Sequence, residues 1–501
     1  MISSTQKSLP RKSLKDLGIS AQKVIDFLTY LKAHSIETHS LMLLRHGHVA
    51  AEGWWEPYRP ELPHMLFSLS KSFTSTAIGM AVHEGYLSVD DAVISFFPDD
   101  QPEEVPDNLA AMKVRHLLTM GTGQAADPME AMHRQEDGNW VRGFLEMPVE
   151  HEPGTFFVYN TGATYMLSAI LQKVTGQTLL EFLQPRLFEP LGIEHPAWES
   201  DPRGINTGGY GLRVTTEDIA KFGQLYLQKG VWDGKRLLEE SWIETATTKQ
   251  ISNGDGGDSD WTQGYGYQFW RCRHGAYRGD GAFGQFCIVL EQYDAVIALT
   301  SGTNDLQGVL DGVWQHLLGA FEGTADLFEE TSDSEEASDQ QGGFGQEGAA
   351  ALEESAELQR CLQELRLAPP QLQAGSELEE AVEGRIYSLA DNGLGIEHTR
   401  VQFDDETAVL SIQHALGEEK LEFGRGTWRH GQLTLLEREQ VAGSFTWQTP
   451  EQLILTLRGI ETPFCYTVEV QFQQEEIELR SRVNVSFGDT EGEVLRGRIK
   501  A

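Results

Sequence analysis

One acidic segment divides the chain into two parts that differ in their pattern of apolar residues. Residues 322–355, EGTADLFEETSDSEEASDQQGGFGQEGAAALEES, contain no Lys or Arg and few large apolar side chains, a composition typical of a disordered linker. Strand-like runs and helical spacing are mixed before it, whereas short alternating runs follow it. We therefore predict three parts, which are a folded domain over 1–320, a disordered acidic linker over 321–357, and a short helix with a β-domain over 358–501.

The strand-like runs of the first part lie at its two ends. LMLLRHGHVAAEG resembles two strands around a turn, and similar material returns at YGYQFWRC, FGQFCIVL and AVIALTSG. The sequence between these ends is mostly helical, which predicts one sheet built from both ends, with helices inserted and a closing helix over 306–318. In the last part, runs such as TAVLSIQ, QLILTLRG and CYTVEVQF are evenly spaced and favour a small β-barrel or sandwich.

Charge and composition exclude several classes of partner. The net charge of −37 would repel nucleic acid and anionic membranes, so small solutes or proteins are the expected partners. The basic N-terminal residues are followed by no apolar run, and no window approaches a spanning helix of about 20 apolar residues. Cys272, Cys287, Cys361 and Cys465 lack CxxC spacing, which argues against a metal knuckle or a disulfide framework. We expect a cytoplasmic protein with reduced thiols.

The stretch MLFSLSKSFTSTAIGMAVHEG carries the strongest chemical signal. Its apolar spacing predicts a helix from Phe67 to Glu84 that stops at Gly85, and it places Ser68 and Lys71 on one face. A serine hydroxyl needs a neighbouring base, and a desolvated lysine near a helix N-terminus can be that base. Ser70 has no lysine three residues beyond it. The alternative is that Ser68 only caps the helix and Lys71 is a solvated residue of its first turn.

This stretch is the first of six sequence blocks that follow one another along the chain. They are MLFSLSKSFTSTAIGMAVHEGYLSVDDAV, VRHLLTMGTG, HEPGTFFVYNTGATYMLSAILQKVTGQ, LFEPLGI, YGLRVTTEDIAKFGQLYLQKGVWDGKRLL and YRGDGAFGQFCIVL. With them the sequence resembles the serine β-lactamase and penicillin-binding protein superfamily, in particular its class C-like branch of β-lactamases, esterases, D-aminopeptidases and amide hydrolases. The resemblance implies an α+β fold, in which an antiparallel sheet is flanked by helices and carries an inserted helical subdomain. It also implies an acyl-enzyme on Ser68, no metal or organic cofactor, and a small ester, amide or peptide substrate.

The second motif of this superfamily aligns with VYNTGAT. By resemblance, Tyr159 relays protons between Ser68, Lys71 and the leaving group, with a phenol pKa lowered by the adjacent ammonium. The superfamily places an asparagine two residues after this tyrosine, where this chain has Thr161 and carries its asparagine at Asn160. Both residues are candidates for substrate binding. The alternative is that Tyr159 is a core aromatic residue that anchors a helix.

The third motif aligns with Gly279, Asp280 and Gly281, where relatives carry Lys-Thr-Gly or His-x-Gly. The resemblance implies that Ala282 supplies the second oxyanion-hole N–H, the first coming from Ser68, and that Asp280 and Gly281 line the substrate site. The charge near the site would then be negative unless Arg278 approaches it, which predicts weak activity on penicillins. The alternative is that RGDGAFG is only a turn that enters a strand.

The histidines do not suggest a metal centre. His46 and His48 flank an expected hairpin turn as exposed residues, and His116 occurs where the superfamily uses a structural histidine. The sequence therefore predicts a serine hydrolase with Ser68, Lys71, Tyr159 and Ala282 in the catalytic roles. The alternative is a non-catalytic or acylation-only sensor of the same fold, with the β-domain as its interaction module. The oligomeric state stays open.

Overall fold

The chain forms two compact units. The computed structural model describes residues 8–322, 344–373, 375–434 and 439–500. The first unit consists of the described residues of Met1–Gly53, Met65–Ser301 and Asp305–Gln363. The second consists of those of Trp54–His64, Gly302–Asn304 and Glu364–Ala501. Two short pieces of the first part of the chain are therefore grouped with the C-terminal unit.

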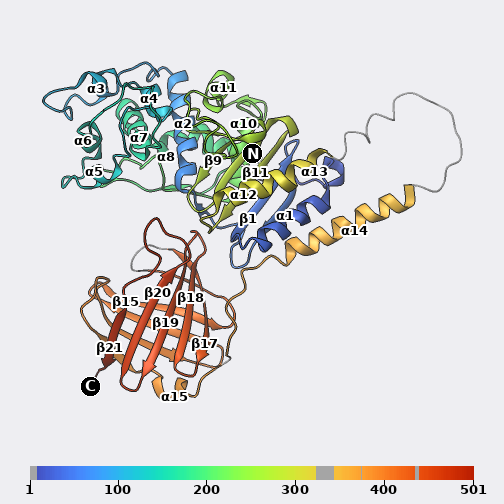
Figure 1. Cartoon of the computed structure of the whole chain (residues 1–501), viewed down its shortest axis with the longest axis vertical. Coiled ribbons are helices and arrows are strands. Elements are labelled where there is room, and N and C mark those ends of the chain that lie inside the picture. The colour runs from blue at the N-terminus through green and yellow to red at the C-terminus, as the bar shows by residue number, and fades with distance from the viewer. Residues whose placement is uncertain (1–7, 323–343, 374, 435–438, 501) are drawn as a thin grey trace, which may run out of the picture. The chain divides into compact units, whose positions relative to one another are not determined.

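A six-stranded sheet forms the centre of the first unit (Figure 1). Its order is β2-β1-β11-β10-β9-β8, and the registered pairs β1–β11, β10–β11, β9–β10 and β8–β9 are antiparallel. The strands are β1 Thr38–Arg45, β2 His48–Trp54, β8 Trp270–Arg271, β9 Tyr277–Gly281, β10 Gln285–Leu290 and β11 Ala295–Ser301. The strands come from the two ends of the predicted first part, so the prediction of one sheet built from both ends is confirmed.

Helices pack around this sheet. Helix α10, Thr216–Leu227, packs on β1, β10 and β11, and α2, Ser70–His83, contacts β9. Helix α1, Ala21–Ala33, lies beside α12, Leu306–Gly312, as Figure 1 shows. The chain continues from α12 through a π-helical turn, η7 Val313–Leu317, into α13, Leu318–Glu322, so the predicted closing helix is confirmed and extends to residue 322.

The helical subdomain lies between the two groups of strands in the sequence. Helix α7 is its most buried long helix, because every residue from Gly162 to Leu171 is buried and α7 packs on α2, α4 and α6. Helix α7 runs over Thr161–Thr175. The other helices of this region and of its borders are η1 Lys15–Leu17, η3 Val93–Phe96, α3 Asp107–Ala111, α4 Val114–Leu118, α5 Met129–His133, α6 Trp140–Leu145, α8 Leu179–Leu183, η4 Gln184–Phe188, α9 Glu189–Leu191, α11 Glu240–Thr247, η5 Arg273–Gly275 and η6 Glu291–Tyr293. The short strands are β3 His64–Met65, β4 Ala197–Trp198, β5 Leu212–Val214, β6 Val231–Trp232 and β7 Lys235–Arg236.

Part of the predicted acidic linker is helical. Residues 323–343 lie outside the described residues, whereas 344–357 form the first part of α14, Phe344–Gln363. Ala and Glu have high helix propensity and are frequent in this stretch, which explains a helix where charge and glycine content indicated disorder. Helix α14 packs along α1, and Leu358 is fully buried.

The second unit is a β-barrel. Nine strands follow the order β15-β14-β13-β12-β21-β20-β19-β18-β17, and a parallel pairing of β15 with β17 closes the ring. Strand β16 adds to β17 outside this ring. The strands are β12 Ile386–Leu389, β13 Ile396–Phe403, β14 Thr407–His414, β15 Gly417–Arg425, β16 Arg429–Gln432, β17 Gln440–Thr449, β18 Gln452–Gly459, β19 Cys465–Gln473, β20 Glu476–Val483 and β21 Leu495–Ile499. The sequence predicted a barrel or a sandwich, and the structure shows a barrel.

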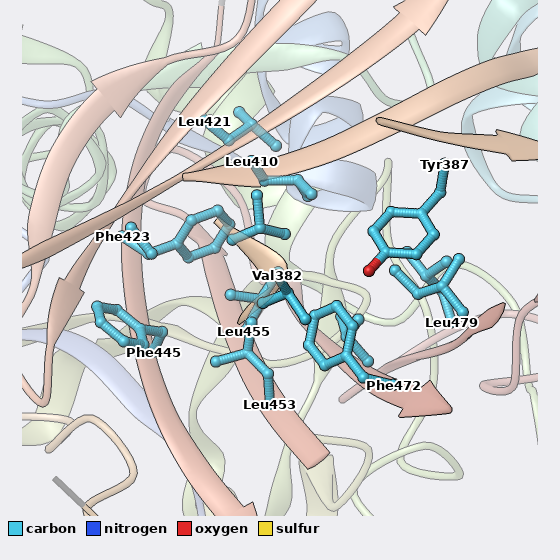
Figure 2. Packing of buried hydrophobic residues seen from close by; sticks show 14 of the residues in the cluster. Val382, Tyr387, Leu410, Leu421, Phe423, Phe445, Leu453, Leu455, Phe472 and Leu479 are labelled. Carbon is cyan, nitrogen blue, oxygen red and sulfur yellow. The ribbon is translucent and has the colours of Figure 1, made fainter. Parts of the chain in front are cut away.

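Side chains fill the barrel interior. Figure 2 shows Phe423, Phe445 and Phe472 directed toward aliphatic side chains such as Leu453 and Leu455, and all five are buried in one cluster. A short helix, α15 Leu378–Val382, adds Val382 to the same cluster. The barrel is therefore a packed core. No described helix of the chain combines the length and the apolar character that crossing a bilayer requires.

Candidate active site

Ser68 lies in a strained turn. It belongs to the 3-10 turn η2, Phe67–Leu69, which leads directly into α2, so the single helix predicted over 67–84 is divided into two elements. Phe67 has a φ of 47°, a left-handed conformation that costs a non-glycine residue about 1–3 kcal/mol. Such a conformation persists only where the surrounding contacts determine it, so packing must hold the residue before Ser68 in place.

A second strained residue packs against the first. The ring of Phe67 meets the ring of Phe283 edge to face, with their centroids 5.3 Å apart, and Phe283 also has a positive φ, of 64°. Phe283 directly follows Ala282 in the turn between β9 and β10. The residue before Ser68 and the residue after Ala282 are therefore in contact, as a shared oxyanion hole would require. The oxyanion role of Ala282 stays a prediction.

Strand β9 approaches η2 and α2 so closely that only glycine fits. A Cβ on Gly279 would lie 2.5 Å from Leu69 Cδ1 and 2.5 Å from Ser72 Oγ, and a Cβ on Gly281 would lie 2.0 Å from the Leu66 carbonyl oxygen. All three distances are well below van der Waals contact. The two glycines of the third motif therefore let the strand run directly beside the nucleophile turn.

Lys71 is buried and hydrogen-bonded to the proposed nucleophile. Its side chain is 1% exposed, and its Nζ lies 2.9 Å from Ser68 Oγ. Nζ also donates to the Gly209 carbonyl oxygen at 2.7 Å and to Thr161 Oγ1 at 3.4 Å. The α2 helix thus places the amine between the hydroxyl it would deprotonate and two acceptors that fix its direction.

The environment of Lys71 favours a neutral amine. Burial lowers the pKa of Lys71 to about 7, although the carboxylates of Asp127 and Asp280 act in the opposite direction. A lysine with a pKa near neutrality is divided between its two protonation states, so it can accept a proton from Ser68 at ordinary pH.

Tyr159 lies beside both Lys71 and Ser68. The Lys71 ammonium nitrogen is 5.0 Å from the centroid of its ring, and the ring stacks on Trp270 with a centroid separation of 5.2 Å. Burial raises the pKa of Tyr159, the Asp280 carboxylate adds to this rise, and a hydrogen bond with the Ser68 side chain opposes it. Our expectation of a lowered phenol pKa was wrong, because desolvation outweighs the hydrogen bond with Ser68 and the nearby charge of Arg278. Tyr159 is thus a protonated phenol that can donate a proton.

The two candidates after Tyr159 occupy different places. Asn160 is fully buried and caps α7, since its Oδ1 accepts the Ala163 N–H at 2.8 Å and its Nδ2 donates to Gln124 Oε1 at 2.7 Å. Thr161 instead presents its hydroxyl to Lys71 Nζ. The contacts of Thr161 bring it into the site, whereas those of Asn160 serve the helix terminus.

Asp280 is already paired. Its Oδ2 accepts a hydrogen bond from Arg278 Nε at 2.8 Å, and the two side chains are 7% and 0% exposed. The Arg278 guanidinium lies 4.6 Å from the ring centroid of Trp261 and 5.5 Å from that of Trp270, and it donates to the Asp260 carbonyl oxygen at 2.9 Å. The sequence predicted a negative charge at this motif unless Arg278 approached it, and Arg278 does approach, because the ion pair is formed within β9.

A second carboxylate, Asp127, lies near the site and was not among the residues predicted from the sequence. Its Oδ2 accepts the Thr161 N–H at 2.8 Å, and its Oδ1 accepts those of Gly162 at 3.3 Å and Met129 at 3.2 Å. Asp127 therefore lies at the N-terminus of α7, and its charge acts to raise the pKa of Lys71. Asp followed by Pro before a short helix indicates a cap, but nothing in that local pattern connects it with Lys71.

The histidines have structural contacts. His116 accepts the Lys113 backbone N–H through Nδ1 at 3.0 Å, and burial lowers its pKa to about 4, which keeps its ring neutral. His46 lies 2.7 Å from Asp294 Oδ2 through its Nδ1. Among the described residues, no three His, Cys, Asp or Glu side chains are grouped as metal ligands.

A cavity of about 650 Å³ lies elsewhere in the first unit. It is lined by residues of the N-terminal segment, of β2 and of α14, and neither Ser68 nor Lys71 is among them. Arg11 lines this cavity, but its guanidinium already forms ion pairs with Glu52 and Glu217. The candidate site is therefore identified by the chemistry of its side chains and not by cavity size.

Comparison with known proteins identifies the family of this chain. The sequence matches the beta-lactamase family over residues 25–318, which is more than half of the chain. The chain belongs to the beta-lactamase family. This match covers η2, α2, α7 and β9, and so all of the elements that carry the candidate site.

Relatives in the beta-lactamase family are hydrolases by name. 6-Aminohexanoate-dimer hydrolase of Paenarthrobacter ureafaciens is 24% identical over 288 residues, which are 54% of this chain and 73% of that protein. Lovastatin esterase of Penicillium rubens is 30% identical over 151 residues, which are 26% of this chain and 37% of the esterase. A solved structure from Bacillus anthracis, provisionally named a 6-aminohexanoate-dimer hydrolase, matches with a TM-score of 0.51 at 22% identity and covers 58% of this chain and 81% of that one. The last match shows the fold alone.

The lowered pKa of Lys71 predicts the pH dependence of acylation. Since the amine must be neutral to accept the Ser68 proton, the rate of labelling by a fluorophosphonate should rise about tenfold per pH unit below pH 7 and level off above it. The measurement is the second-order labelling rate between pH 5 and 10. A rate that is flat across this range, or that first rises near pH 10, would contradict Lys71 as the base.

The same burial predicts that Lys71 lowers stability. The folded state binds its proton less tightly than the unfolded chain, so the unfavourable contribution is full below pH 7 and disappears as the pH rises to 10.5. Lys71→Met should therefore be more stable than the wild type by about 1–4 kcal/mol at pH 7, with a smaller gain at pH 10. Thermal melting at both pH values tests this, and Lys32→Met, which removes an exposed lysine, controls for net charge. A gain that does not depend on pH would exclude the titration of Lys71 as its cause.

Proposed function

We propose that the protein is a serine hydrolase that cleaves an ester or amide bond through an acyl-enzyme on Ser68. The single observation that carries this proposal is the 2.9 Å hydrogen bond between the Ser68 hydroxyl and the buried amine of Lys71. The names of its relatives, a dimer hydrolase and an esterase, support the same reaction class. They leave the choice between ester and amide substrates open.

The first half of the reaction uses Lys71 as the general base. The amine takes the hydroxyl proton as Ser68 Oγ forms a bond to the substrate carbonyl carbon, and the carbonyl oxygen becomes an oxyanion. Backbone N–H groups of Ser68 and Ala282 would hold that oxyanion, and the closeness of β9 to η2 supports their pairing.

The second half uses Tyr159 as the proton donor. Its raised pKa keeps the phenol protonated, so it can give its proton to the leaving oxygen or nitrogen and regain one from the Lys71 ammonium. The leaving group departs with that proton, and the acyl group stays on Ser68. Water then attacks the ester, with the neutral Lys71 accepting its proton, and the acid is released as Ser68 is restored.

The charges near Lys71 favour substrates without a carboxylate. Asp280 is neutralised by Arg278, and Lys71 is largely neutral above pH 7, which leaves the charge of Asp127. At an assumed distance of about 7 Å and an effective dielectric of about 20, one such charge disfavours an anion by about 2 kcal/mol, or roughly thirtyfold. We therefore propose neutral esters, or amides bearing a free amine, as the preferred substrates over penicillins.

The identity of the nucleophile is tested by covalent labelling. A fluorophosphonate should add one group per chain at Ser68, and Ser68→Ala should abolish it, while Ser70→Ala should still be labelled. Labelling of Ser68→Ala at the wild-type rate would exclude the assignment. Turnover of p-nitrophenyl butyrate then separates an enzyme from a sensor, because an acylation-only protein would release one equivalent of nitrophenol and stop.

Substrate charge is tested at Asp280. Asp280→Asn leaves the buried Arg278 without its carboxylate, so the ratio of kcat/KM for benzylpenicillin to that for p-nitrophenyl acetate should rise about tenfold to a hundredfold. Breaking the pair should also cost about 3–5 kcal/mol of stability, so both activities are measured well below the melting temperature. Asp489→Asn, at an exposed position of the barrel unit, removes the same charge and should leave the ratio unchanged. An unchanged ratio in Asp280→Asn would overturn the electrostatic argument.

A further inference from the structure

The chain crosses between the two units just before the nucleophile. Residues Trp54–His64 belong to the barrel unit, and Met65 returns to the first unit. Three residues separate His64 from Ser68, and such a stretch spans at most roughly 14 Å when fully extended. A short length of chain therefore connects the segment directly to Ser68.

Backbone hydrogen bonds fix one end of this segment within the barrel unit. The Glu56 N–H donates to the Leu365 carbonyl oxygen at 3.1 Å, and the Leu367 N–H donates to the Glu56 carbonyl oxygen at 2.8 Å. This pairing forms a parallel β-bridge between Glu56 and Arg366. Residues that precede Ser68 are thereby paired with the chain that leads into the barrel.

Tyr58 anchors the middle of the segment. It is 5% exposed, and its hydroxyl donates to the Thr462 carbonyl oxygen at 2.9 Å. Its ring packs in a small apolar cluster with Ala442 and Ile460, and the partly buried Leu62, Leu367 and Trp428 pack against that cluster. Arg458 also lies over the ring, with its guanidinium carbon 5.9 Å from the centroid. A buried ring with a bonded hydroxyl makes this the firmest attachment that the segment has among its described contacts.

The Ser68 turn needs such an attachment. Phe67 keeps its left-handed conformation only while its neighbours hold it. The Leu66 N–H donates to the Leu212 carbonyl oxygen at 2.9 Å, and the Phe283 ring supports Phe67 from the β9–β10 turn. These contacts hold the turn from the first unit, whereas the chain entering it comes directly from the segment that Tyr58 anchors.

We propose that Tyr58 is a positioning residue for Ser68, so that the barrel domain helps to hold the nucleophile in its reactive geometry. This inference rests on the proposed function, since it assumes that Ser68 is the nucleophile. When Tyr58 is lost, the segment gains freedom, Phe67 relaxes toward an ordinary conformation, and Ser68 Oγ moves out of line with Lys71. Displacement of a reacting atom by about 1 Å can lower a rate by about a hundredfold.

The barrel unit holds a second piece of the first part of the chain in a similar way. Asn484 donates through Nδ2 to the Gly302 carbonyl oxygen at 3.4 Å and to the Pro463 carbonyl oxygen at 3.0 Å, and its Oδ1 accepts the Cys465 N–H at 2.8 Å. Gly302 directly follows β11, which pairs with β1 and β10 in the central sheet. Two segments of the first part of the chain, Trp54–His64 and Gly302–Asn304, are therefore grouped with the barrel unit.

The test compares Tyr58→Ala with Tyr466→Ala in the full-length protein. Tyr466 lies on β19 of the same barrel and is 43% exposed, so its loss controls for removal of a barrel tyrosine. Tyr58→Ala should lower the fluorophosphonate labelling rate of Ser68 and the kcat for p-nitrophenyl butyrate by about tenfold to a hundredfold, with KM changed less than about threefold. Amides of residues 65–71 should exchange hydrogen faster in this variant than in Tyr466→Ala, which should match the wild type.

Each outcome decides the inference. Wild-type labelling and exchange rates in a folded Tyr58→Ala protein would overturn it, while labelling of wild-type Ser68 would still support the proposed function. Failure of the wild type to be labelled at Ser68 would instead remove the proposed function. If Tyr58→Ala does not fold, Tyr58→Phe decides, because it keeps the ring and loses only the hydroxyl bond. A threefold to tenfold slower labelling rate is then expected, and an unchanged rate would overturn the inference.

Discussion

The burial of a single amine is the constraint on which the rest of the site depends. Lys71 is 1% exposed, and burial lowers its pKa to about 7. A charged amine in such a place requires compensation, and a neutral one requires acceptors for its N–H groups. The chain supplies the Gly209 carbonyl oxygen and the Thr161 hydroxyl, so the amine is held beside Ser68 in either state. The reactivity that we propose for Ser68 would thus follow from desolvation of Lys71, to which the packing of α2 on α7 contributes.

Close packing extends from the amine to the strand beside it. Gly279 and Gly281 let β9 run against η2 and α2 at distances that no side chain would allow. Near this close approach Phe283 packs against Phe67, and both residues have a positive φ. The strained conformations therefore lie in the two turns next to Ser68, which is the proposed nucleophile. Apolar contacts around these turns offset the strain.

The sequence predicted what depends on local spacing and missed what depends on distant contacts. The spacing of Ser68 and Lys71 defines their shared face within one turn, and the alternation of apolar residues identified both the sheet and the strands of the barrel. The direction of the Tyr159 pKa was wrong because burial is a property of the folded molecule. Asp127 lies over thirty residues from Tyr159 in the sequence, and the crossing of Trp54–His64 into the barrel unit follows from Tyr58 packing on residues some four hundred positions away. Residues 344–357 of helix α14 were predicted as linker because the surrounding sequence is acidic and contains glycine, although Ala and Glu favour a helix there.

The ion pair between Arg278 and Asp280 within β9 affects both the substrate preference that we propose and the stability of the folded chain. Arg278 and Asp280 lie two positions apart on one strand, so both side chains leave the same face and neutralise one another between Trp261 and Trp270. A buried ion pair of this kind adds little stability compared with apolar residues, yet removing one partner is costly. Neither residue can therefore be changed alone without leaving a buried charge close to Tyr159, whose pKa responds to both. A single substitution at this motif should therefore change the preference for substrate charge at the cost of stability, and a second, coordinated substitution would be needed to avoid that cost.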